Sequence, residues 1–401
     1  MMNILYVMPR FPSPSETFIA EEMMGVRARG NDVTVVSLAR PPAEQVARMG
    51  SRLRAAAENV IYLDRVPLTL DAIAACFRPS VRRLNGGISS AATFRTSTAV
   101  RLLRASAVKR IAHRVGTELI FAHWPRATEV AMVAGEIARL PVAFSVHAHE
   151  VAHDNGHFTL AFEHAQAATF CNAASMDYLM NVLPTTASAK SSLVYHGIDL
   201  SQFKALPLPP AGNVLKVVTA GRLTPTKGID RLIRAATLAR DRGVPFELMI
   251  IGDGSERGSL ETLVTASDLG TLVRFTGWVP HEQMVHHLSA AHVFALMADA
   301  DFNDGLPNVV LEAMAIGRPI IISPLPAVAE AVLHNENGYV LSTVEAVEEF
   351  ADCCTNLRSA RGTLERWAAA AIVDVRARHD RALHLDRLCA LLDSASKAYA
   401  A

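Results

Sequence analysis

Two segments of the C-terminal half combine charged side chains with glycine turns in a pattern that suits phosphate chemistry. The first is GRLTPTKGID, where Arg222 and Lys227 stand between an apolar run and a helical pattern. Glycine frees the turn, and the helix that follows presents the positive end of its dipole. Two cations and a dipole at one point suit a diphosphate, and they would stabilise the charge that a departing nucleoside diphosphate gains in the transition state. For this segment alone, an ordinary surface loop with two solvated charges is the alternative.

The second segment is DGLPNVVLEAMAIGRPIIIS, which places two acids, Asp304 and Glu312, on either side of a turn. We predict that this turn opens a helix with Glu312 about one turn inside it. The turn offers backbone N–H groups to phosphate or sugar oxygens, and the carboxylates can accept hydrogen bonds from hydroxyls. Two solvated carboxylates are the alternative if the spacing is taken by itself. The residues that form the predicted turn are Gly305, Leu306, Pro307 and Asn308.

Two sites in the N-terminal half lie where predicted strands end. Ser15 and Glu16 follow the first apolar run, and a helix N-cap is their structural alternative. His147 closes the run PVAFSVH, and a buried core histidine is its alternative. If both halves bind ligands at the carboxyl ends of their strands, these residues belong to the same active site as the C-terminal motifs.

A run of histidines and acids begins at His147 and invites a metal site as an alternative, because imidazoles four residues apart can share a helical face. The run follows a strand end and lacks the HExxH pattern, which argues against that interpretation. Its further members are His149, Glu150, His153, Asp154 and His157.

A basic stretch runs from Arg78 to Arg114 without a single Asp or Glu. It includes RLLRASAVKRIAHR, whose leucines and isoleucine share one helical stripe. A basic amphipathic helix on a protein of zero net charge suits an anionic membrane surface. A solvated helix face, or contacts within the protein, is the alternative.

These motifs must be positioned by strands that alternate with helices. The strands are apolar throughout rather than at every second residue, which indicates parallel strands buried on both faces. We therefore predict an α/β protein with two Rossmann-like, doubly wound parallel sheets that face each other across a cleft. The predicted parts are an N-terminal domain at residues 1–201, a proline-rich linker at 202–213, a second domain at 214–361 and a helical tail at 362–401.

Composition is that of a globular protein: 401 residues, half of them hydrophobic, with formal net charge zero. A neutral chain has no global field to attract nucleic acid. Five scattered cysteines without a CxxC spacing argue against a disulfide framework or a zinc site and favour a reducing compartment. The first residues lack the pattern of a signal peptide, and no uncharged apolar run reaches the length of a membrane span. We expect a cytoplasmic protein that at most rests on the inner face of a membrane.

In order and spacing, the motifs resemble the retaining glycosyltransferases of family 4, which have the GT-B fold of two facing Rossmann-like domains. The N-terminal segments resemble the branch that builds bacterial exopolysaccharides such as colanic acid. The resemblance covers nearly the whole chain. It rests on GRLTPTKGID, IIGDGSER, VRFTGWVP and DGLPNVVLEAMAIGRPII in the C-terminal half, and on FPSPSETFIAEEM, FAHWP, FSVHAHE and LVYHGIDLSQF in the N-terminal half.

The resemblance implies that Arg222 and Lys227 hold the donor diphosphate, while Glu312, the second acid of the E-x7-E pattern, binds the ribose hydroxyls. Asp304 occupies the first acid position, where the pattern has Glu, so its carboxylate is one methylene shorter for contact with the donor sugar.

Three further residues receive roles from the same family. The backbone around Trp278 and Val279 would line the base pocket, and His147 would lie beside the donor sugar or phosphate. No catalytic metal or cofactor is implied, because the nucleotide sugar is a substrate.

Together these features predict sugar transfer, with retained configuration, from a nucleotide diphosphate sugar to a glycan or lipid-linked acceptor for surface polysaccharide. A sugar-nucleotide epimerase of GT-B fold and a non-catalytic sugar-nucleotide-binding protein are the alternatives. Turnover of a panel of nucleotide sugars separates the three.

Overall fold

The computed structural model describes residues 1–13, 16–47, 51–64, 66–91, 97–147, 155–299 and 305–400. Its internal contacts divide the chain into two compact units. Unit 1 comprises Met1–His196 and Ala382–Ala401, and unit 2 comprises Gly197–Arg381. The predicted change of domain lies in a linker at 202–213, followed by a C-terminal tail at 362–401, whereas this division falls after His196 and gives the last helix to unit 1.

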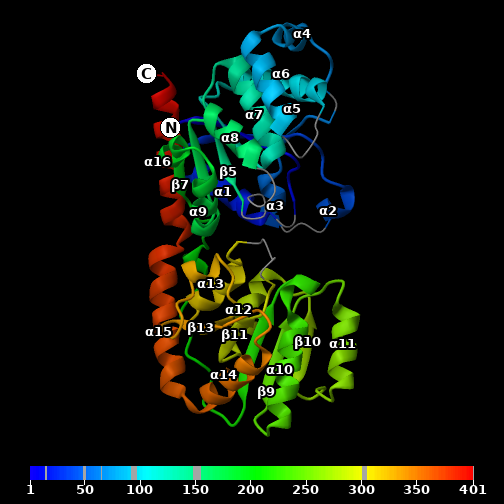
Figure 1. The fold of residues 1–401 in the computed structure, drawn as a ribbon, viewed down its shortest axis with the longest axis vertical. Coiled ribbons are helices and arrows are strands. Elements are labelled where there is room, and N and C mark those ends of the chain that lie inside the picture. The colour runs from blue at the N-terminus through cyan, green and yellow to red at the C-terminus, as the bar shows by residue number, and fades with distance from the viewer. Residues whose placement is uncertain are drawn as a thin grey trace. The chain divides into compact units, whose positions relative to one another are not determined.

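Unit 1 is built on a parallel sheet. Its described residues form seven strands in the order β3-β2-β1-β4-β5-β6-β7, of which β5 and β7 are labelled in Figure 1. The strands are β1 (Asn3–Met8), β2 (Asp32–Ser37), β3 (Ile61–Tyr62), β4 (Leu119–His123), β5 (Val142–Val146), β6 (Ala167–Phe170) and β7 (Ser191–Leu193). The helices are α1 (Thr17–Ala28), α2 (Ala43–Ala47), α3 (Ser51–Ala56), α4 (Leu70–Cys76), α5 (Pro79–Ala91), α6 (Thr98–Val115), α7 (Pro125–Ala138), α8 (Asn155–His164), α9 (Ala173–Val182), η2 (Thr185–Lys190) and α16 (Arg381–Ala400).

Unit 2 repeats the plan. Its described residues form a six-stranded parallel sheet in the order β10-β9-β8-β11-β12-β13. The strands are β8 (Leu215–Ala220), β9 (Phe246–Ile251), β10 (Val273–Gly277), β11 (Val293–Leu296), β12 (Ile320–Ile322) and β13 (Gly338–Val340). The helices are η3 (Leu200–Gln202), η4 (Pro225–Lys227), α10 (Ile229–Asp241), α11 (Arg257–Ala266), α12 (His281–Ser289), α13 (Asn308–Ala315), η5 (Val328–Glu330), α14 (Val347–Ser359) and α15 (Arg361–Arg378).

Each sheet is buried on both faces, as apolar strands require. In β1, Leu5 and Val7 belong to one hydrophobic core while Ile4 and Tyr6 belong to another. The same alternation divides unit 2, where Val217 and Val218 of β8 belong to different hydrophobic cores. Two-sided burial explains why these strands show no polar face. The predicted α/β class with Rossmann-like parallel sheets is confirmed, and each run that was predicted to be a strand overlaps one.

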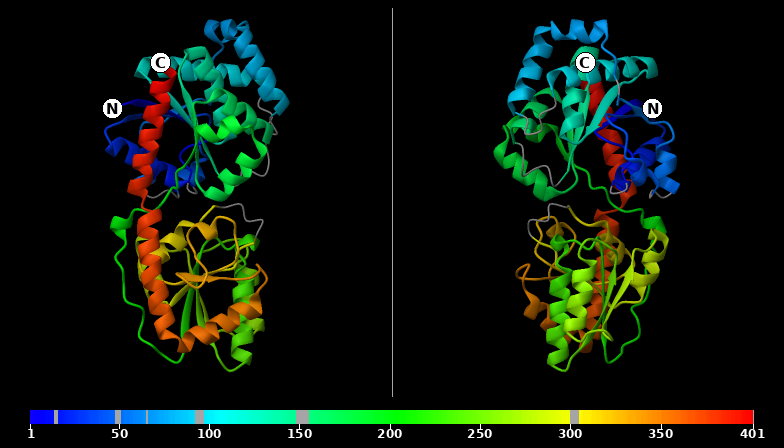
Figure 2. Two further views of the ribbon diagram at one scale, coloured as in Figure 1. Left: turned by 60° about the vertical axis from the view of Figure 1, so that its left-hand side comes forward. Right: turned by 90° about the vertical axis from the view of Figure 1, so that its right-hand side faces the viewer.

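The C-terminal tail forms two helices. Helix α15 packs on α13 in unit 2, and α16 runs along unit 1, as the red ribbon shows in both views of Figure 2. Three leucines of α16, Leu385, Leu388 and Leu392, are buried in the same core as Tyr6. The last helix therefore stabilises the N-terminal sheet. Among the described residues, no helix is both long and apolar enough to cross a membrane.

Candidate functional site

The strand order of unit 2 reverses between β8 and β11. Open parallel sheets bind ligands outside the carboxyl ends of their strands at such a reversal. The loop after β8 carries Arg222 and Lys227, and the backbone N–H of Asp299, after β11, donates to the carbonyl of Thr226 at 2.9 Å. The two loops on either side of the reversal are therefore joined.

Gly228 allows these loops to approach each other closely. It adopts the left-handed conformation, with φ of 60°, as the N-cap of α10. A Cβ atom at this position would clash with the carbonyl oxygen of Met297. Both facts require glycine, because any other residue would meet the backbone of the neighbouring loop as well as an unfavourable φ.

Arg231, in the first turn of α10, ties down the loop after β11. Its guanidinium donates to the carbonyl of Met297 at 3.0 Å and to the carboxylate of Asp299 at 2.5 Å. It also pairs with Glu345. Burial alone would lower the pKa of Arg231, but the hydrogen bonds to Glu345 and Asp299 raise it overall. This arginine supports the loop, a role that was not predicted from the sequence.

The two cations predicted to hold a diphosphate differ in exposure. Arg222 is exposed, and Lys227 is half-buried with its alkyl chain beside Gly221. Lys227 ends η4 immediately before α10, so its ammonium stands near the positive end of that helix. Two positive side chains and a helix N-terminus on one loop give this edge of the sheet a local positive potential.

The predicted turn after β11 opens helix α13, which begins at Asn308. Glu312 lies one turn inside that helix and is buried. Its predicted partner Asp304 lies outside the described residues. The residues Gly305, Leu306, Pro307 and Asn308 are half-buried and precede or begin α13. Glu312 and the β8 loop thus belong to elements on either side of the strand reversal.

Trp278 and Val279 follow β10, two strands away from β8. Trp278 is 75 % exposed, while Val279 packs partly against the core. They lie at the same carboxyl edge as Arg222 but outside the strand reversal. The structure therefore places all the described C-terminal site residues at one edge of the sheet.

In unit 1 the strand order reverses between β1 and β4. Glu16 follows β1 and Trp124 follows β4, and the indole Nε1 of Trp124 donates to Glu16 Oε1 at 3.3 Å. Glu16 is the N-cap residue of α1, but its carboxylate does not cap that helix. Burial raises the pKa of Glu16 to about 7, even though the charge of Arg10 opposes the shift. A carboxyl group that titrates near neutral pH at a ligand-binding edge is a candidate functional group. Ser15 lies outside the described residues.

Trp124 has a strained backbone, with φ of 71° and ψ of 147°. This region is essentially restricted to glycine and costs on the order of 1–3 kcal/mol for other residues. The conformation directs the indole to Glu16 and brings its ring edge-on to His147, with ring centroids 3.7 Å apart. Trp124 therefore joins the two sites that were predicted separately in the N-terminal half.

A chain of buried polar groups runs behind His147. Nε2 of His147 lies 3.2 Å from Nδ1 of His123, whose other ring nitrogen lies 3.2 Å from a carboxylate oxygen of Glu22. The hydroxyl of Tyr6 donates to the same carboxylate at 3.1 Å. Burial alone would raise the pKa of Glu22, but the His123 charge and hydrogen bond lower it overall. The contacts place His123 between Glu22 and His147, with one ring nitrogen facing each.

His147 also lies close to two residues from neighbouring loops. Potential ligand atoms of His147, Cys171 and His196 lie within 4.8 Å of one another. Burial lowers the pKa of His196 to about 4, so this imidazole is neutral at physiological pH. Of the histidine run considered for metal binding, only its two ends lie in the described part of the chain, and His157 is buried in α8. The residues between them, His149, Glu150, His153 and Asp154, fall outside it.

The basic stretch is divided by the fold. Arg101 is buried and pairs with buried Glu129 at 3.3 Å, so the alternative of contacts within the protein holds for this residue. Arg82, Arg83 and Arg114 are exposed. Beside them α4 and its flanking residues expose apolar side chains that no sequence pattern had indicated. These are Leu68, Leu70, Ile73 and Phe77, with Leu70 85 % and Phe77 70 % exposed.

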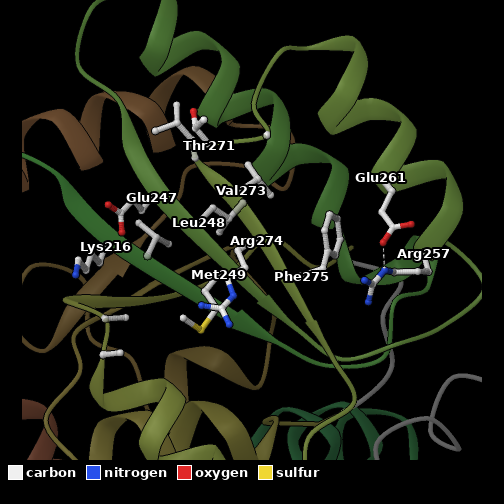
Figure 3. A pocket seen from close by; sticks show the side chains of 15 residues that line it. Lys216, Glu247, Leu248, Met249, Arg257, Glu261, Thr271, Val273, Arg274 and Phe275 are labelled. Atoms are coloured by element: carbon white, nitrogen blue, oxygen red, sulfur yellow. Dashed lines mark hydrogen bonds and ion pairs between the residues drawn. The ribbon is translucent and has the colours of Figure 1, made fainter.

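A cavity of about 730 Å³ lies elsewhere on unit 2, at the amino ends of β8, β9 and β10. Figure 3 shows Arg274 beside Met249 at its centre and the ion pair of Arg257 with Glu261 at its side. Lys216 and Glu247, which are register partners, lie at its other side. Because ligands of such sheets bind at the opposite, carboxyl ends, we do not assign the donor to this cavity.

Several residues of the unit 1 site were not predicted from the sequence: Glu22, His123, Trp124, Cys171 and His196. A signal was present for three of them, because His123 and Trp124 end the predicted strand run LIFAHW and Cys171 lies in the predicted run ATFCNA. His196 likewise lies in the predicted run SLVYHG, whereas Glu22 had no such signal because it lies inside a helix.

Comparison with known proteins gives these sites a context. Residues 206–373 match the family Glycosyl transferases group 1. The chain is 30 % identical over 155 residues to "Amylovoran biosynthesis glycosyltransferase AmsK" of Erwinia amylovora, a match that spans only 38 % of either chain. It is 22 % identical over 365 residues to "Putative colanic acid biosynthesis glycosyltransferase WcaL" of Salmonella typhimurium, covering 86 % of this chain and 88 % of that protein.

Among solved structures, Anabaena Alr3699/HepE in complex with UDP aligns with a TM-score of 0.73 and 19 % identity, over 98 % of this chain and all of that one. This likeness confirms the GT-B fold class. The resemblance to group 1 glycosyltransferases is likewise confirmed for the C-terminal segment.

Proposed function

We propose that this chain, whose residues 206–373 match the group 1 glycosyltransferases, is a retaining glycosyltransferase that moves a sugar from a nucleotide diphosphate donor to a glycan or lipid-linked acceptor. The relatives named for amylovoran and colanic acid biosynthesis support a role in surface polysaccharide synthesis. Unit 2 binds the donor, and unit 1 supplies the acceptor side.

One observation carries the donor assignment: the joined loops at the strand reversal of unit 2. They combine Arg222, Lys227 and the N-terminus of α10 with the buried carboxylate of Glu312 on α13. The cations suit a diphosphate, and the carboxylate suits the ribose hydroxyls. The UDP complex of the HepE neighbour supports a nucleoside diphosphate ligand for this kind of fold.

In the proposed mechanism the acceptor hydroxyl attacks the anomeric carbon from the face on which the phosphate departs. The acceptor O–C1 bond forms, the C1–O phosphate bond breaks, and the acceptor proton passes to the departing phosphate oxygen. Arg222 and Lys227 stabilise the negative charge that develops on the diphosphate. Because this charge is larger in the transition state than in the ground state, they lower the activation barrier. No metal takes part in this step.

The carboxyl edge of unit 1 is assigned to the reacting sugar: His147 keeps the place beside the donor sugar or phosphate that the resemblance implies, and the acceptor approaches from this side. His147 and Glu16 meet there through Trp124, and both can donate or accept hydrogen bonds to sugar hydroxyls. Ser15, next to Glu16, is included in this proposal. Asp304 is assigned to the donor sugar.

A second part of the proposal concerns an anionic bilayer as a docking partner for unit 1. Exposed Leu70 and Phe77 of the α4 region adjoin exposed arginines of α5 such as Arg82 and Arg83. Apolar side chains enter the interface while basic groups contact lipid phosphates, each adding about 1 kcal/mol. Such docking would bring the enzyme to a lipid-linked acceptor.

The decisive experiment is turnover by the purified full chain with a panel of nucleotide sugars and isolated polysaccharide-lipid acceptors. Transfer with release of the nucleoside diphosphate, and an unchanged anomeric configuration by NMR, is expected. Conversion of the sugar without transfer would indicate an epimerase. Tight binding of a nucleotide sugar without any turnover would indicate a binding protein. Either of these results would overturn the proposal.

A further inference from the structure

The carboxyl edge of unit 1 gathers three side chains that commonly bind transition metals. His147 directly follows β5, Cys171 directly follows β6, and His196 lies three residues beyond β7. These strands are adjacent in the sheet, and Phe170 is in register with both Val146 and Leu193. Three consecutive parallel strands therefore deliver the three residues to one place.

The distances suit a single ion. The potential donor atoms lie within 4.8 Å of one another, whereas the ligands of a tetrahedral zinc ion are separated by about 3.5 Å. Small side-chain rotations would therefore bring the donor atoms to the separation that one ion requires. His147 is buried, while Cys171 and His196 are half-buried, so an ion can enter from solvent.

The surroundings of His147 also resemble those of a metal ligand. Its Nε2 lies 3.2 Å from Nδ1 of His123, and the other ring nitrogen of His123 lies 3.2 Å from a carboxylate oxygen of Glu22. Histidine ligands are typically oriented in this way by hydrogen bonds through their other ring nitrogen. The side-chain amide of Asn172 donates to the sulfur of Cys171 at 3.4 Å and so orients the second ligand.

We propose that His147, Cys171 and His196 form a binding site for one zinc-class divalent cation. Two imidazoles and a thiolate select Zn²⁺ or Co²⁺ over Mg²⁺ and Ca²⁺, which prefer oxygen ligands. On binding, the Cys171 S–H bond is broken, a sulfur–metal bond forms and the proton leaves to solvent. This site departs from the expectation that the chain binds no metal, and it differs from the histidine run considered from the sequence.

The ion has a consequence for catalysis, which rests on the proposed function. The bound ion uses His147 as a ligand, and the same side chain is assigned to the reacting sugar of the transfer reaction. Metal binding and sugar transfer therefore compete for His147. Zinc therefore acts as an inhibitor of transfer.

The test uses the full chain, freed of metal and titrated with Co²⁺ as a spectroscopic probe. One equivalent should give a thiolate-to-cobalt absorption band in the near ultraviolet, which Zn²⁺ abolishes and excess Mg²⁺ does not. Cys171→Ser should remove the band, and His196→Gln should weaken binding by at least ~10-fold. Cys76→Ser, which alters a half-buried thiol on α4, is the matched control and should keep the band.

A second measurement guards against misfolded variants. Zn²⁺ should raise the Tm of the wild type and of Cys76→Ser, but not that of Cys171→Ser, while circular dichroism verifies the fold of each protein. A titration without the thiolate band, or a band that survives in both Cys171→Ser and His196→Gln, overturns the site.

The transfer assay separates the two proposals. Zn²⁺ should inhibit the wild type and spare residual transfer by Cys171→Ser. If the metal-free protein transfers no sugar but still gives the cobalt band when it is titrated with Co²⁺, the proposed function fails and the metal site stands. If transfer is active and the metal binds without inhibiting it, the competition for His147 is overturned.

Discussion

The indole Nε1 of Trp124 donates a hydrogen bond of 3.3 Å to the Glu16 carboxylate, which links the loops after β1 and β4 across 108 residues of chain. The second oxygen of Glu16 is buried without a hydrogen-bond partner among the described atoms. This environment disfavours a charged carboxylate and explains its raised pKa.

Glu16 should make folding stability depend on pH. Its pKa rises from the ordinary 4.5 to about 7 in the folded state. Between these values the unfolded chain releases the proton and the folded chain keeps it, so the group destabilises the fold increasingly as pH rises, and the effect levels off above about pH 7. The Glu16→Gln side chain cannot ionise. As pH rises from 4.5 to 8, the free energy of unfolding of this variant should therefore rise by up to ~3 kcal/mol relative to that of the wild type. Urea unfolding at several pH values measures the difference. Exposed Glu58→Gln is the control, and a pH-independent difference for Glu16→Gln would contradict the prediction.

Arg222 and Lys227 should contribute to catalysis more than to folding. Because both stabilise the departing diphosphate, Arg222→Ala or Lys227→Ala should each lower kcat by at least ~10²-fold, the scale of losing one preorganised charge-stabilising donor. Arg234→Ala, at an exposed arginine on α10, is the matched control and should leave kcat near the wild-type value. Steady-state kinetics with the best donor measures the effect, and near-wild-type kcat in both site variants would remove the assignment.

Asp304 and Glu312 should separate sugar contact from nucleotide contact. Asp304→Asn keeps the size of the side chain but loses its charge, and a charge-assisted hydrogen bond is roughly twice as strong as a neutral one. Transfer should therefore fall while affinity for the bare nucleoside diphosphate stays nearly unchanged. Glu312→Gln should instead lower the affinity for the bare nucleoside diphosphate, because Glu312 is assigned to its ribose hydroxyls. Calorimetric affinities and transfer rates for the two variants test this. If Asp304→Asn transfers sugar like the wild type, Asp304 is only a turn residue and does not contact the donor sugar.

Gly228 should be essential for the loop contact at the strand reversal of unit 2. Gly228→Ala introduces a Cβ that meets the Met297 carbonyl and also places alanine at a φ of 60°. Gly243→Ala is a close control, because its φ is 73° and nothing lies within 4 Å of the added atom. We expect the control to cost about 1 to 2 kcal/mol and Gly228→Ala to cost clearly more. Denaturant unfolding of both variants tests this, and equal losses would show that the loops separate without cost.

Docking on membranes should need the apolar α4 side chains as well as positive charge. Leu70→Glu and Phe77→Glu should reduce flotation with anionic vesicles, and added salt should weaken binding because exposed charges are screened over ~8 Å at physiological ionic strength. Val373→Glu, at a residue 66 % exposed on α15, is the matched control and should float like the wild type. Equal flotation with neutral and anionic vesicles would refute the docking.

Much of this molecule was determined by local sequence. Apolar runs such as NILYVM and LKVVTAG predicted buried parallel strands, and the GRLTPTKGID segment that continues LKVVTAG predicted a loop with phosphate-binding character. These features depend on neighbouring residues, because hydrophobic period and turn chemistry are set within a few positions. Arg222, Lys227 and Glu312 were found in this way, since the elements that carry them are contiguous in the chain.

Only the tertiary structure decided which strands are neighbours. The reversals at β1/β4 and β8/β11 place Trp124 beside Glu16 and join the loops around Gly228 and Met297. Pairing between strands far apart in the chain leaves no periodic trace in either segment, so a residue such as Cys171 looked like an isolated thiol. Burial is likewise a property of the assembled fold: Arg101 belongs to a basic stretch in the sequence, but packing turns it toward Glu129 and away from solvent.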